Sequence, residues 1–244
     1  MRLALSVRAQ PLHRIRAITL DLDDTLWAIA PVIERAEREL WSWLAEHYPR
    51  VRDCWDADGL AGLRERTFLE HRARAHDLRF LRRAMLAEIA AVAGYGDELV
   101  DPAFAVFDRA RNAVDLYPDV VPALERLRDD FALVAVTNGN ACLATIGIRH
   151  LFDDVVTAAE AGVAKPAPAI FDAACLRAGA QPDEVVHVGD HPEFDIAGAK
   201  QAGLRAAWIN RRGDPWPQHL SRPDAEISAL GELAALLTPL AHAR

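Results

Sequence analysis

The chain has 244 residues, with 28 lysines and arginines against 36 aspartates and glutamates, so its formal net charge is −8. This length suggests one large domain or a core with a smaller module, and 51% hydrophobic residues exclude a disordered chain. The acidic balance excludes broad nucleic-acid binding, which needs a basic face, and no apolar run approaches the roughly 20 residues of a membrane span. No signal peptide is expected at the start, and three distant cysteines are typical of reduced thiols in a cytoplasmic protein: Cys54, Cys142 and Cys175.

Short apolar runs predict the strands of a parallel sheet. Each is rich in apolar residues and ends at a polar residue or a glycine; the runs are 15–22, 131–136, 185–188 and 204–209, with a weaker one at 154–157. Helical spacing of apolar residues occurs between them at 119–129, 168–178 and 193–202, and 227–237 is expected to be a closing helix. Strands that alternate with helices of about ten residues predict an α/β fold with a Rossmann-like parallel sheet.

The stretch 28–115 is different, because its pattern is helical throughout and no strand run interrupts it. It follows directly after the first predicted strand. We therefore predict an inserted helical cap at 28–115, in a core made of 15–27 and 116–244. Residues 1–14 are expected to be an N-terminal extension.

Chemically active side chains follow the ends of the predicted strands. In an open parallel sheet, ligands bind outside the carboxyl ends of the strands, so these side chains are expected to meet at one edge. They are acids, a hydroxyl, an amide and a lysine: Asp21, Asp23, Thr137, Asn138, Lys165, Asp190 and Asp195.

The acids in this group predict a metal ion. Mutual repulsion would raise their pKa values unless a cation is present, and hard oxygen ligands at a partly open site suit Mg²⁺. Mg²⁺ beside a lysine, a threonine hydroxyl and backbone N–H groups makes a phosphate site. Asp21 and Asp23 point to the same side of an extended backbone, so one could attack a substrate while the other moves a proton.

Each of these residues also has a structural explanation when it is taken alone. An aspartate after a buried strand often caps a helix or forms a turn, and a lone lysine is usually solvated. Lys165 is harder to explain in this way, because only two of the 28 basic residues are lysines, the other being Lys200. A site that needs a compact ammonium, which arginine cannot replace, is a physical reason for a lysine at this position. The joint occurrence of these groups, in order and at strand ends, favours a functional site.

This ordered set resembles the motifs of the haloacid dehalogenase (HAD) superfamily. DLDDT at 21–25 resembles its first motif, DxDxT, and Thr137 matches the second. Lys165 in KPAPAIF matches the third, and GDHPEFD, with Asp190 and Asp195, resembles the acidic fourth. The resemblance covers the chain beyond residue 14, and the insert resembles a C1-type helical cap.

The resemblance implies a Mg²⁺-dependent phosphoric monoester hydrolase that works through a phosphoaspartate. Asp21 would be the nucleophile, and Asp23 would protonate the leaving oxygen and then deprotonate water. Mg²⁺ would be held by the Asp21 carboxylate, the Asp23 backbone carbonyl and Asp190.

The resemblance also implies roles for the remaining motif residues. Thr137, Asn138 and Lys165, together with Asp21, would bind the phosphoryl group. Asp195 would support the metal or orient Lys165.

Three alternatives stay open within the same fold. True dehalogenases of the superfamily carry no acid two residues after the nucleophile and need no metal, so Asp23 favours phosphate transfer over cleavage of a carbon–halogen bond. A phosphomutase would share these motifs. A catalytically idle binding protein would be expected to have lost a motif residue, and none is lost here.

The substrate is expected to be a small phosphorylated metabolite. VAVTNGNA, HVGD and the C-terminal EISALGELAALL are similar to a bacterial branch of flavin-pathway phosphatases, which act on flavin mononucleotide and 5-amino-6-(5-phospho-D-ribitylamino)uracil. No nucleic-acid or membrane partner is expected, and the protein would be a monomer or a homodimer.

The segment Arg64–Arg83 holds seven arginines against three acids, a local charge of about +4. The arginines either form ion pairs on a solvated helix face or attract an anionic substrate.

Overall fold

The structure is a computed structural model that describes residues 12–239. It forms two compact units. Among the described residues, the core unit contains 12–27, 116–137 and 148–239, and the helical unit contains 28–115 and 138–147. Residues 138–147, which were expected in the core, group by their contacts with the helical unit.

The core unit is built on a six-stranded sheet in the order β4-β3-β2-β5-β6-β7, and every neighbouring pair is parallel. The strands are β2 (Ala17–Leu20), β3 (Ala132–Thr137), β4 (Asp154–Thr157), β5 (Val185–Gly189), β6 (Arg205–Ile209) and β7 (Ala225–Ile227). The chain fills one side of β2 with β3 and β4 before it crosses to β5. The strand order therefore reverses at β2, where α/β proteins form their ligand-binding crevice.

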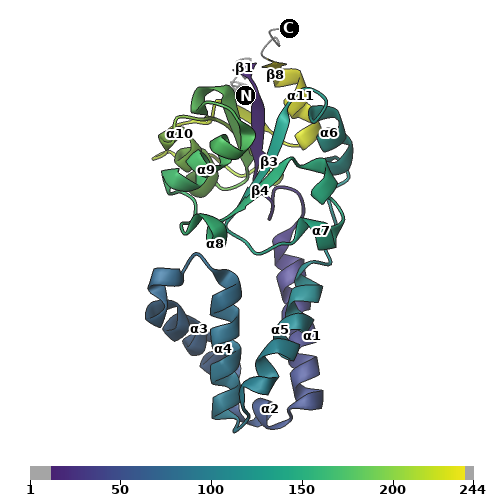
Figure 1. The fold of residues 1–244 in the computed structure, drawn as a ribbon, viewed down its shortest axis with the longest axis vertical. Coiled ribbons are helices and arrows are strands. Elements are labelled where there is room, and N and C mark those ends of the chain that lie inside the picture. The colour runs from purple at the N-terminus through teal and green to yellow at the C-terminus, as the bar shows by residue number, and fades with distance from the viewer. Residues whose placement is uncertain (1–11, 240–244) are drawn as a thin grey trace, which may run out of the picture. The chain divides into compact units, whose positions relative to one another are not determined.

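Helices cover both faces of this sheet, and the predicted α/β fold is confirmed (Figure 1). Figure 1 shows α9 (Pro168–Ala178) and α10 (Gly198–Gln201) on one side, and α6 (Val120–Leu127) and α11 (Leu233–Leu236) on the other. Strands covered on both faces are apolar at successive positions, and all residues of β2 and β5 are indeed buried. A short helix α8 (Ala158–Ala161) follows β4.

The helical unit consists of α1 (Ile29–His47), α2 (Arg50–Cys54), α3 (Ala57–Glu70), α4 (Leu78–Val92), α5 (Val100–Arg111) and α7 (Leu143–Ile146). Within it, α1 packs along α5, and α3 lies beside α4 (Figure 1). Asp56 and Asp77 cap the starts of α3 and α4, accepting hydrogen bonds from the backbone N–H groups of Gly59 and Phe80. Apolar residues on the facing sides of these helices form a separate core.

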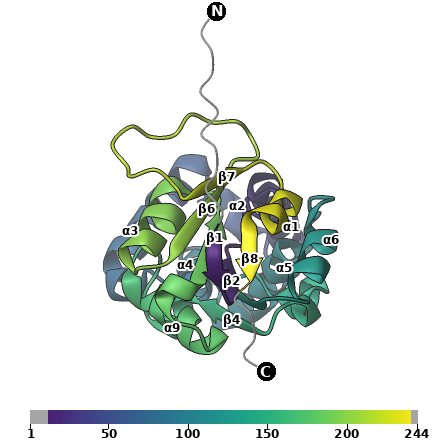
Figure 2. The ribbon, with the colours of Figure 1, turned by 90° about the horizontal axis from the view of Figure 1, so that it is seen from above.

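The two ends of the described chain differ from the expectation. Residues 12–14, expected in an extension, belong to β1 (Leu12–Ile15), which pairs in parallel with β8 (Leu237–Pro239) (Figure 2). The predicted closing helix 227–237 is reduced to α11 and a preceding 3₁₀ turn. The last residue of this segment, Leu237, already belongs to β8 and pairs with Leu12 of β1, so tertiary context overrides the helical local pattern at this end. The expected extension over residues 1–11 lies outside the described residues.

The structure also shows the state of the cysteines, all three of which are free: Cys54, Cys142 and Cys175. No helix in the range 12–239 combines the length and apolarity that crossing a bilayer requires.

Candidate active site

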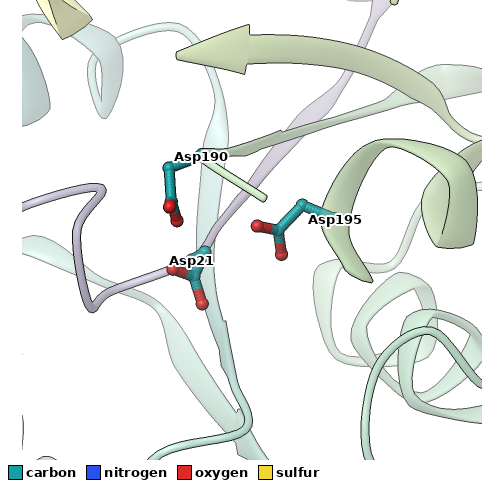
Figure 3. A group of neighbouring side chains, drawn as sticks. All are labelled: Asp21, Asp190 and Asp195. Carbon is teal, nitrogen blue, oxygen red and sulfur yellow. The ribbon is translucent and has the colours of Figure 1, made fainter. Parts of the chain in front are cut away.

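Three aspartates meet at the carboxyl edge of the core sheet. Asp21 directly follows β2, Asp190 directly follows β5, and Asp195 lies in the π-helical turn Pro192–Ala197. One carboxylate oxygen from each residue lies within 4.8 Å of those of the other two. Figure 3 shows the side chains of Asp190 and Asp195 directed toward Asp21. The sheet topology therefore brings together acids that are as much as 174 (195 − 21) residues apart in the chain.

Lys165 lies in the loop between α8 and α9, and its ammonium reaches the same aspartates. Its Nζ donates hydrogen bonds to Asp21 Oδ1 at 2.5 Å, to Asp195 Oδ1 at 2.6 Å and to the Val136 carbonyl at 3.0 Å. An ammonium has three N–H bonds, and these three acceptors surround it. Lys165 is only 4% exposed, so its charge is balanced by the carboxylates beside it.

Asp195 is held on both of its oxygens. Oδ1 contacts the ring nitrogen Nε2 of His187 at 3.2 Å in addition to Lys165, and Oδ2 accepts a hydrogen bond from the His191 backbone N–H at 2.9 Å. Gly189 makes room for this side chain, because a Cβ at position 189 would lie 2.3 Å from Asp195 Cγ. Contacts under about 3 Å between such atoms are repulsive, so the close approach needs a glycine.

The electrostatics of the site indicate a deficit of positive charge. Burial raises the pKa of Asp21 well above its usual value, and the carboxylates of Asp195 and Asp190 add to the rise, while Lys165 opposes it. Burial, followed by the charge of Asp195, raises the pKa of Asp190 to about 7. One ammonium therefore does not neutralise three adjacent carboxylates, and the cluster favours a further cation.

Lys165 and Asp195 behave as a buried ion pair. Burial alone would raise the pKa of Asp195, but the Lys165 charge and the His187 hydrogen bond outweigh it and lower that pKa. Burial alone would lower the pKa of Lys165, but Asp195 and Asp21 outweigh it and raise that pKa. Both groups are therefore ionised at neutral pH.

The loop after β2 positions Asp23. The Trp27 indole Nε1 donates a hydrogen bond to Asp23 Oδ1 at 2.9 Å, and Trp27 is completely buried. Asp24, with φ of 59°, turns the chain in the left-handed region, and its N–H donates to the Trp27 carbonyl at 2.7 Å. Thr25 Oγ1 lies 3.4 Å from Asp190 Oδ1, so the loop also contacts the acid after β5. Sequence reasoning missed the role of Trp27 in orienting Asp23.

Thr137 ends β3 beside β2, so it lies at the same edge of the sheet as Asp21. It is 1% exposed. Asn138 is the next residue along the chain, and it belongs by contacts to the helical unit. Asp21, Thr137, Lys165, Asp190 and Asp195 thus lie together at this edge of the core sheet. Asp23 lies in the adjoining loop, and Asn138 is the first residue of the segment 138–147 in the helical unit.

Two further buried polar residues lie behind the site and were missed as functional candidates. Thr19 on β2 and His187 on β5 are completely buried within strands that are otherwise mostly apolar. A polar side chain inside a buried strand is a signal that the sequence does contain, as in VVHV, because such positions are normally apolar.

In the helical unit, the arginines of the segment 64–83 form ion pairs. Five of the seven pair closely with acids: Arg66 with Glu88, Arg74 with Asp77, Arg79 with Asp108, Arg82 with Glu37 and Arg83 with Asp101. Four of these five acids lie outside the segment. The local charge of about +4 that the segment has by itself is therefore largely offset by its neighbours.

Comparison with known proteins identifies the family. The haloacid dehalogenase-like hydrolase family matches residues 15–203. The chain therefore belongs to the haloacid dehalogenase-like hydrolases, as its motifs predict.

Individual relatives cover nearly the whole chain. The chain is 32% identical over 236 residues to the 5-amino-6-(5-phospho-D-ribitylamino)uracil phosphatase YigB of Escherichia coli, covering 93% of this chain and 98% of the relative. It is 35% identical over 239 residues to a glyceraldehyde 3-phosphate phosphatase of Methanopyrus kandleri, covering 93% and 99%. A crystal structure of a 2-haloacid dehalogenase from Pseudomonas syringae pv. Tomato DC3000 superimposes with a TM-score of 0.87 at 41% identity, covering 91% and 97%. These likenesses confirm the predicted enzyme class, a phosphoric monoester hydrolase of the HAD superfamily, and the resemblance to flavin-pathway phosphatases.

Proposed function

We propose that this hydrolase is a Mg²⁺-dependent phosphatase that transfers the phosphoryl group of a small phosphomonoester to Asp21 and then to water. The observation that carries the proposal is the buried Lys165 ammonium, held between Asp21 and Asp195 at the switch point of the sheet. Such a cation stabilises negative charge that develops on a transferring phosphoryl group, because it is fixed in place before the reaction begins.

The residues of the site fit a bound Mg²⁺. Three carboxylates lie together, and the pKa values of Asp21 and Asp190 are raised by burial and by mutual repulsion, a situation that a divalent cation relieves. Asp195 already accepts hydrogen bonds on both oxygens, so Asp21 and Asp190, with the backbone carbonyl of Asp23, would hold the ion. When bound, the ion would offset negative charge on the carboxylates and on the phosphoryl oxygens.

The chain's own residues then account for both halves of the reaction. The Asp21 carboxylate attacks phosphorus, the bond to the leaving oxygen breaks, and Asp23 gives that oxygen a proton. Asp23 next takes a proton from water, which attacks the acyl phosphate and releases inorganic phosphate from Asp21. The hydrogen bond from Trp27 holds one oxygen of Asp23 and so orients this carboxyl group. Thr137 and Asn138 donate hydrogen bonds to the phosphoryl oxygens, and Lys165 turns toward them the N–H that it donates to Asp21 Oδ1 in the free protein.

The helical unit has a pocket of its own. It contains a cavity of about 270 Å³ with a largely apolar lining, and two arginines, Arg64 and Arg82, are part of it. Ligand sites typically combine an apolar wall with a few polar groups. This combination suits a planar, partly apolar group with polar substituents. A flavin-pathway phosphate as substrate is supported by the likeness to the ribitylaminouracil phosphatase YigB. The apolar lining comes from Ile33, Phe68, Leu78, Leu81, Met85 and Phe107.

Hydrolysis of p-nitrophenyl phosphate with Mg²⁺ or with EDTA tests the reaction class. We expect Asp21→Asn to abolish turnover, because an amide cannot form the acyl phosphate. We expect Asp23→Asn to lose on the order of 10²–10⁴-fold in rate. Mass spectrometry of the acid-quenched wild type should find the phosphoryl group on the peptide that carries Asp21. Near-normal turnover by pure Asp21→Asn protein would contradict the mechanism.

A dehalogenase is the second candidate, because of the structural likeness to a 2-haloacid dehalogenase. Chloride release from 2-chloropropionate in EDTA, without hydrolysis of p-nitrophenyl phosphate, would favour it. The substrate itself is tested with a panel of phosphomonoesters, in which we expect flavin mononucleotide or the ribitylaminouracil phosphate to have the highest kcat/KM. Sugar phosphates or glyceraldehyde 3-phosphate that exceed both by more than about tenfold, or about 1.4 kcal/mol, would remove the substrate proposal and leave the phosphatase standing.

A further inference from the structure

Two completely buried polar side chains face each other across the strands that carry the site. Thr19 on β2 and His187 on β5 are partners in the strand register, and Thr19 Oγ1 lies 2.9 Å from His187 Nδ1. The other ring nitrogen, Nε2, lies 3.2 Å from Asp195 Oδ1. The Phe171 ring lies nearly perpendicular to the imidazole, with 5.1 Å between the ring centroids. The imidazole is therefore contacted at both of its nitrogens and by an aromatic ring.

The direction of each hydrogen bond follows from the partners. The Asp195 carboxylate is ionised beside Lys165 and can only accept, so His187 Nε2 carries the proton and donates it. A neutral imidazole protonated on Nε2 has a bare Nδ1, which accepts, so the Thr19 hydroxyl donates to it. Burial lowers the pKa of His187, which agrees with a neutral ring. Asp195 thus selects the tautomer, because its carboxylate can only accept, and the Thr19 hydroxyl stabilises that tautomer by donating to Nδ1.

Lys165 extends this set of hydrogen bonds to Asp21. The Asp195 oxygen that accepts from His187 is the same oxygen, Oδ1, that accepts from Lys165 Nζ at 2.6 Å. Lys165 Nζ in turn donates to Asp21 Oδ1. A rotation of the Asp195 carboxylate would therefore move the acceptor that holds the ammonium beside Asp21.

We propose that Thr19 and His187 are positioning residues, which hold the Asp195 carboxylate in the orientation that places the Lys165 ammonium against Asp21. The inference rests on the proposed phosphatase function. A purely structural role explains less, because β5 fills its other core positions with Val185, Val186 and Val188, and an apolar residue would avoid the desolvation of an imidazole. Among residues 12–239, His187 is the one buried histidine.

Two substitutions at position 187 separate positioning from packing. The amide nitrogen of glutamine can reach the place of Nε2 and donate to Asp195, whereas asparagine is shorter and keeps only a group near Nδ1. Both are polar and uncharged. Because a displaced ammonium weakens stabilisation of the transition state more than binding of the ground state, we expect the effect in kcat. His187→Asn should lose about tenfold or more in kcat on p-nitrophenyl phosphate, with KM changed less than about twofold, and His187→Gln should stay within about threefold of wild type.

Two substitutions of Thr19 provide an independent test if the variants at position 187 do not fold. Thr19→Ser keeps the hydroxyl, and Thr19→Val keeps the shape without it. We expect Thr19→Ser to match wild type and Thr19→Val to lower kcat severalfold. In protein labelled with ¹⁵N-histidine, long-range ¹⁵N–¹H correlation spectra should show the Nε2–H tautomer for wild type, and the Nδ1 resonance should shift in Thr19→Val.

The outcomes are distinguishable. If wild type hydrolyses no phosphomonoester, the proposed function fails, while the tautomer measured by spectroscopy still tests the geometry. If wild type is active and His187→Asn equals His187→Gln in kcat, or if Thr19→Val equals Thr19→Ser, the positioning role is wrong. A proton found on Nδ1 would also overturn it.

Discussion

Replacement of Lys165 by arginine tests whether the site requires a compact ammonium. Three acceptors surround a single nitrogen, at 2.5 Å from Asp21, 2.6 Å from Asp195 and 3.0 Å from the Val136 carbonyl. A guanidinium spreads its five N–H bonds over a larger plane and cannot place one nitrogen within reach of all three. Because Lys165 is 4% exposed, the extra atoms would have to displace packed neighbours, at a cost of about 1–3 kcal/mol in unfolding free energy.

The expected loss of activity follows from the role of the ammonium. Removal of one preorganised group that stabilises the transition state typically costs on the order of 10²–10³-fold in kcat, and a displaced cation should approach this range. The assay is kcat/KM for p-nitrophenyl phosphate at saturating Mg²⁺, with urea unfolding to show that the variant folds. Lys200→Arg is the matched control, because Lys200 Nζ is more exposed and donates to the Arg222 carbonyl away from the three aspartates. We expect the control to stay within about 0.5 kcal/mol of wild-type stability and to keep its activity.

The result that would refute this reasoning is a folded Lys165→Arg enzyme with more than about half of wild-type kcat/KM, a difference of only ~0.4 kcal/mol. Lys165→Met extends the test to stability. It leaves Asp21 and Asp195 without their ammonium, and breaking a buried ion pair from one side costs about 3–5 kcal/mol. We expect this loss in EDTA and a partial recovery of stability in Mg²⁺. Equal stability of Lys165→Met and wild type in EDTA would mean that the pair is not maintained in solution.

Three more predictions concern the metal, a glycine and the partly buried ion pair of Asp119 with Arg211. EDTA should inactivate the enzyme and Mg²⁺ should restore it, whereas Ca²⁺ should inhibit, because its larger and looser coordination shell would misplace the nucleophile; full activity in EDTA would contradict a metal-dependent site. Gly189→Ala should lower the unfolding free energy in urea by about 1–3 kcal/mol and lower kcat strongly, because its Cβ would overlap Asp195. Gly231→Ala, where no neighbouring atom lies within 4 Å of the added Cβ, should change neither quantity. Equal effects of the two substitutions would contradict the role of Gly189. Burial alone would raise the pKa of Asp119, but hydrogen bonds from Arg211 and from the Leu230 N–H outweigh it and lower that pKa. The ionised form of Asp119 therefore stabilises the fold above the unfolded-state pKa of about 4. This stabilisation is lost as the pH falls through the lower folded-state pKa. The difference in unfolding free energy between wild type and Asp119→Asn should therefore be largest near neutral pH and shrink at about pH 3, and a difference that grows on acidification would show the opposite linkage.

Local pattern was sufficient for the parts of the fold in which each residue's environment depends on its chain neighbours. The apolar runs became β2, β3 and β5, strands of a sheet that is covered on both faces. Asp21 follows the last residue of β2, and Thr137 and Gly189 are the last residues of β3 and β5. The general rule that parallel strands present their carboxyl ends at one edge then brings the polar residues that follow them together. For this reason the acids and Lys165 could be predicted to converge without knowledge of any distance.

The tertiary structure alone decided the features that depend on partners far away in the chain. The segment 227–237 has a helical pattern, yet its end pairs as β8 with β1, more than 220 residues earlier, and no local window contains both strands. The segment 64–83 counts as strongly positive by itself, but Arg82 finds Glu37 on α1 and Arg79 finds Asp108 on α5.

The same reason explains why His187 was overlooked. In the sequence His187 is a single polar residue inside an apolar run. Its role depends on the strand register, which places it opposite Thr19, 168 residues away, and on the turn that brings Asp195 back to it. A buried polar group is tolerated only where hydrogen-bond partners are supplied, and those partners come from other strands and turns. The sequence by itself therefore determined which groups gather at the site, whereas only the packing of the sheet decided what holds them in place.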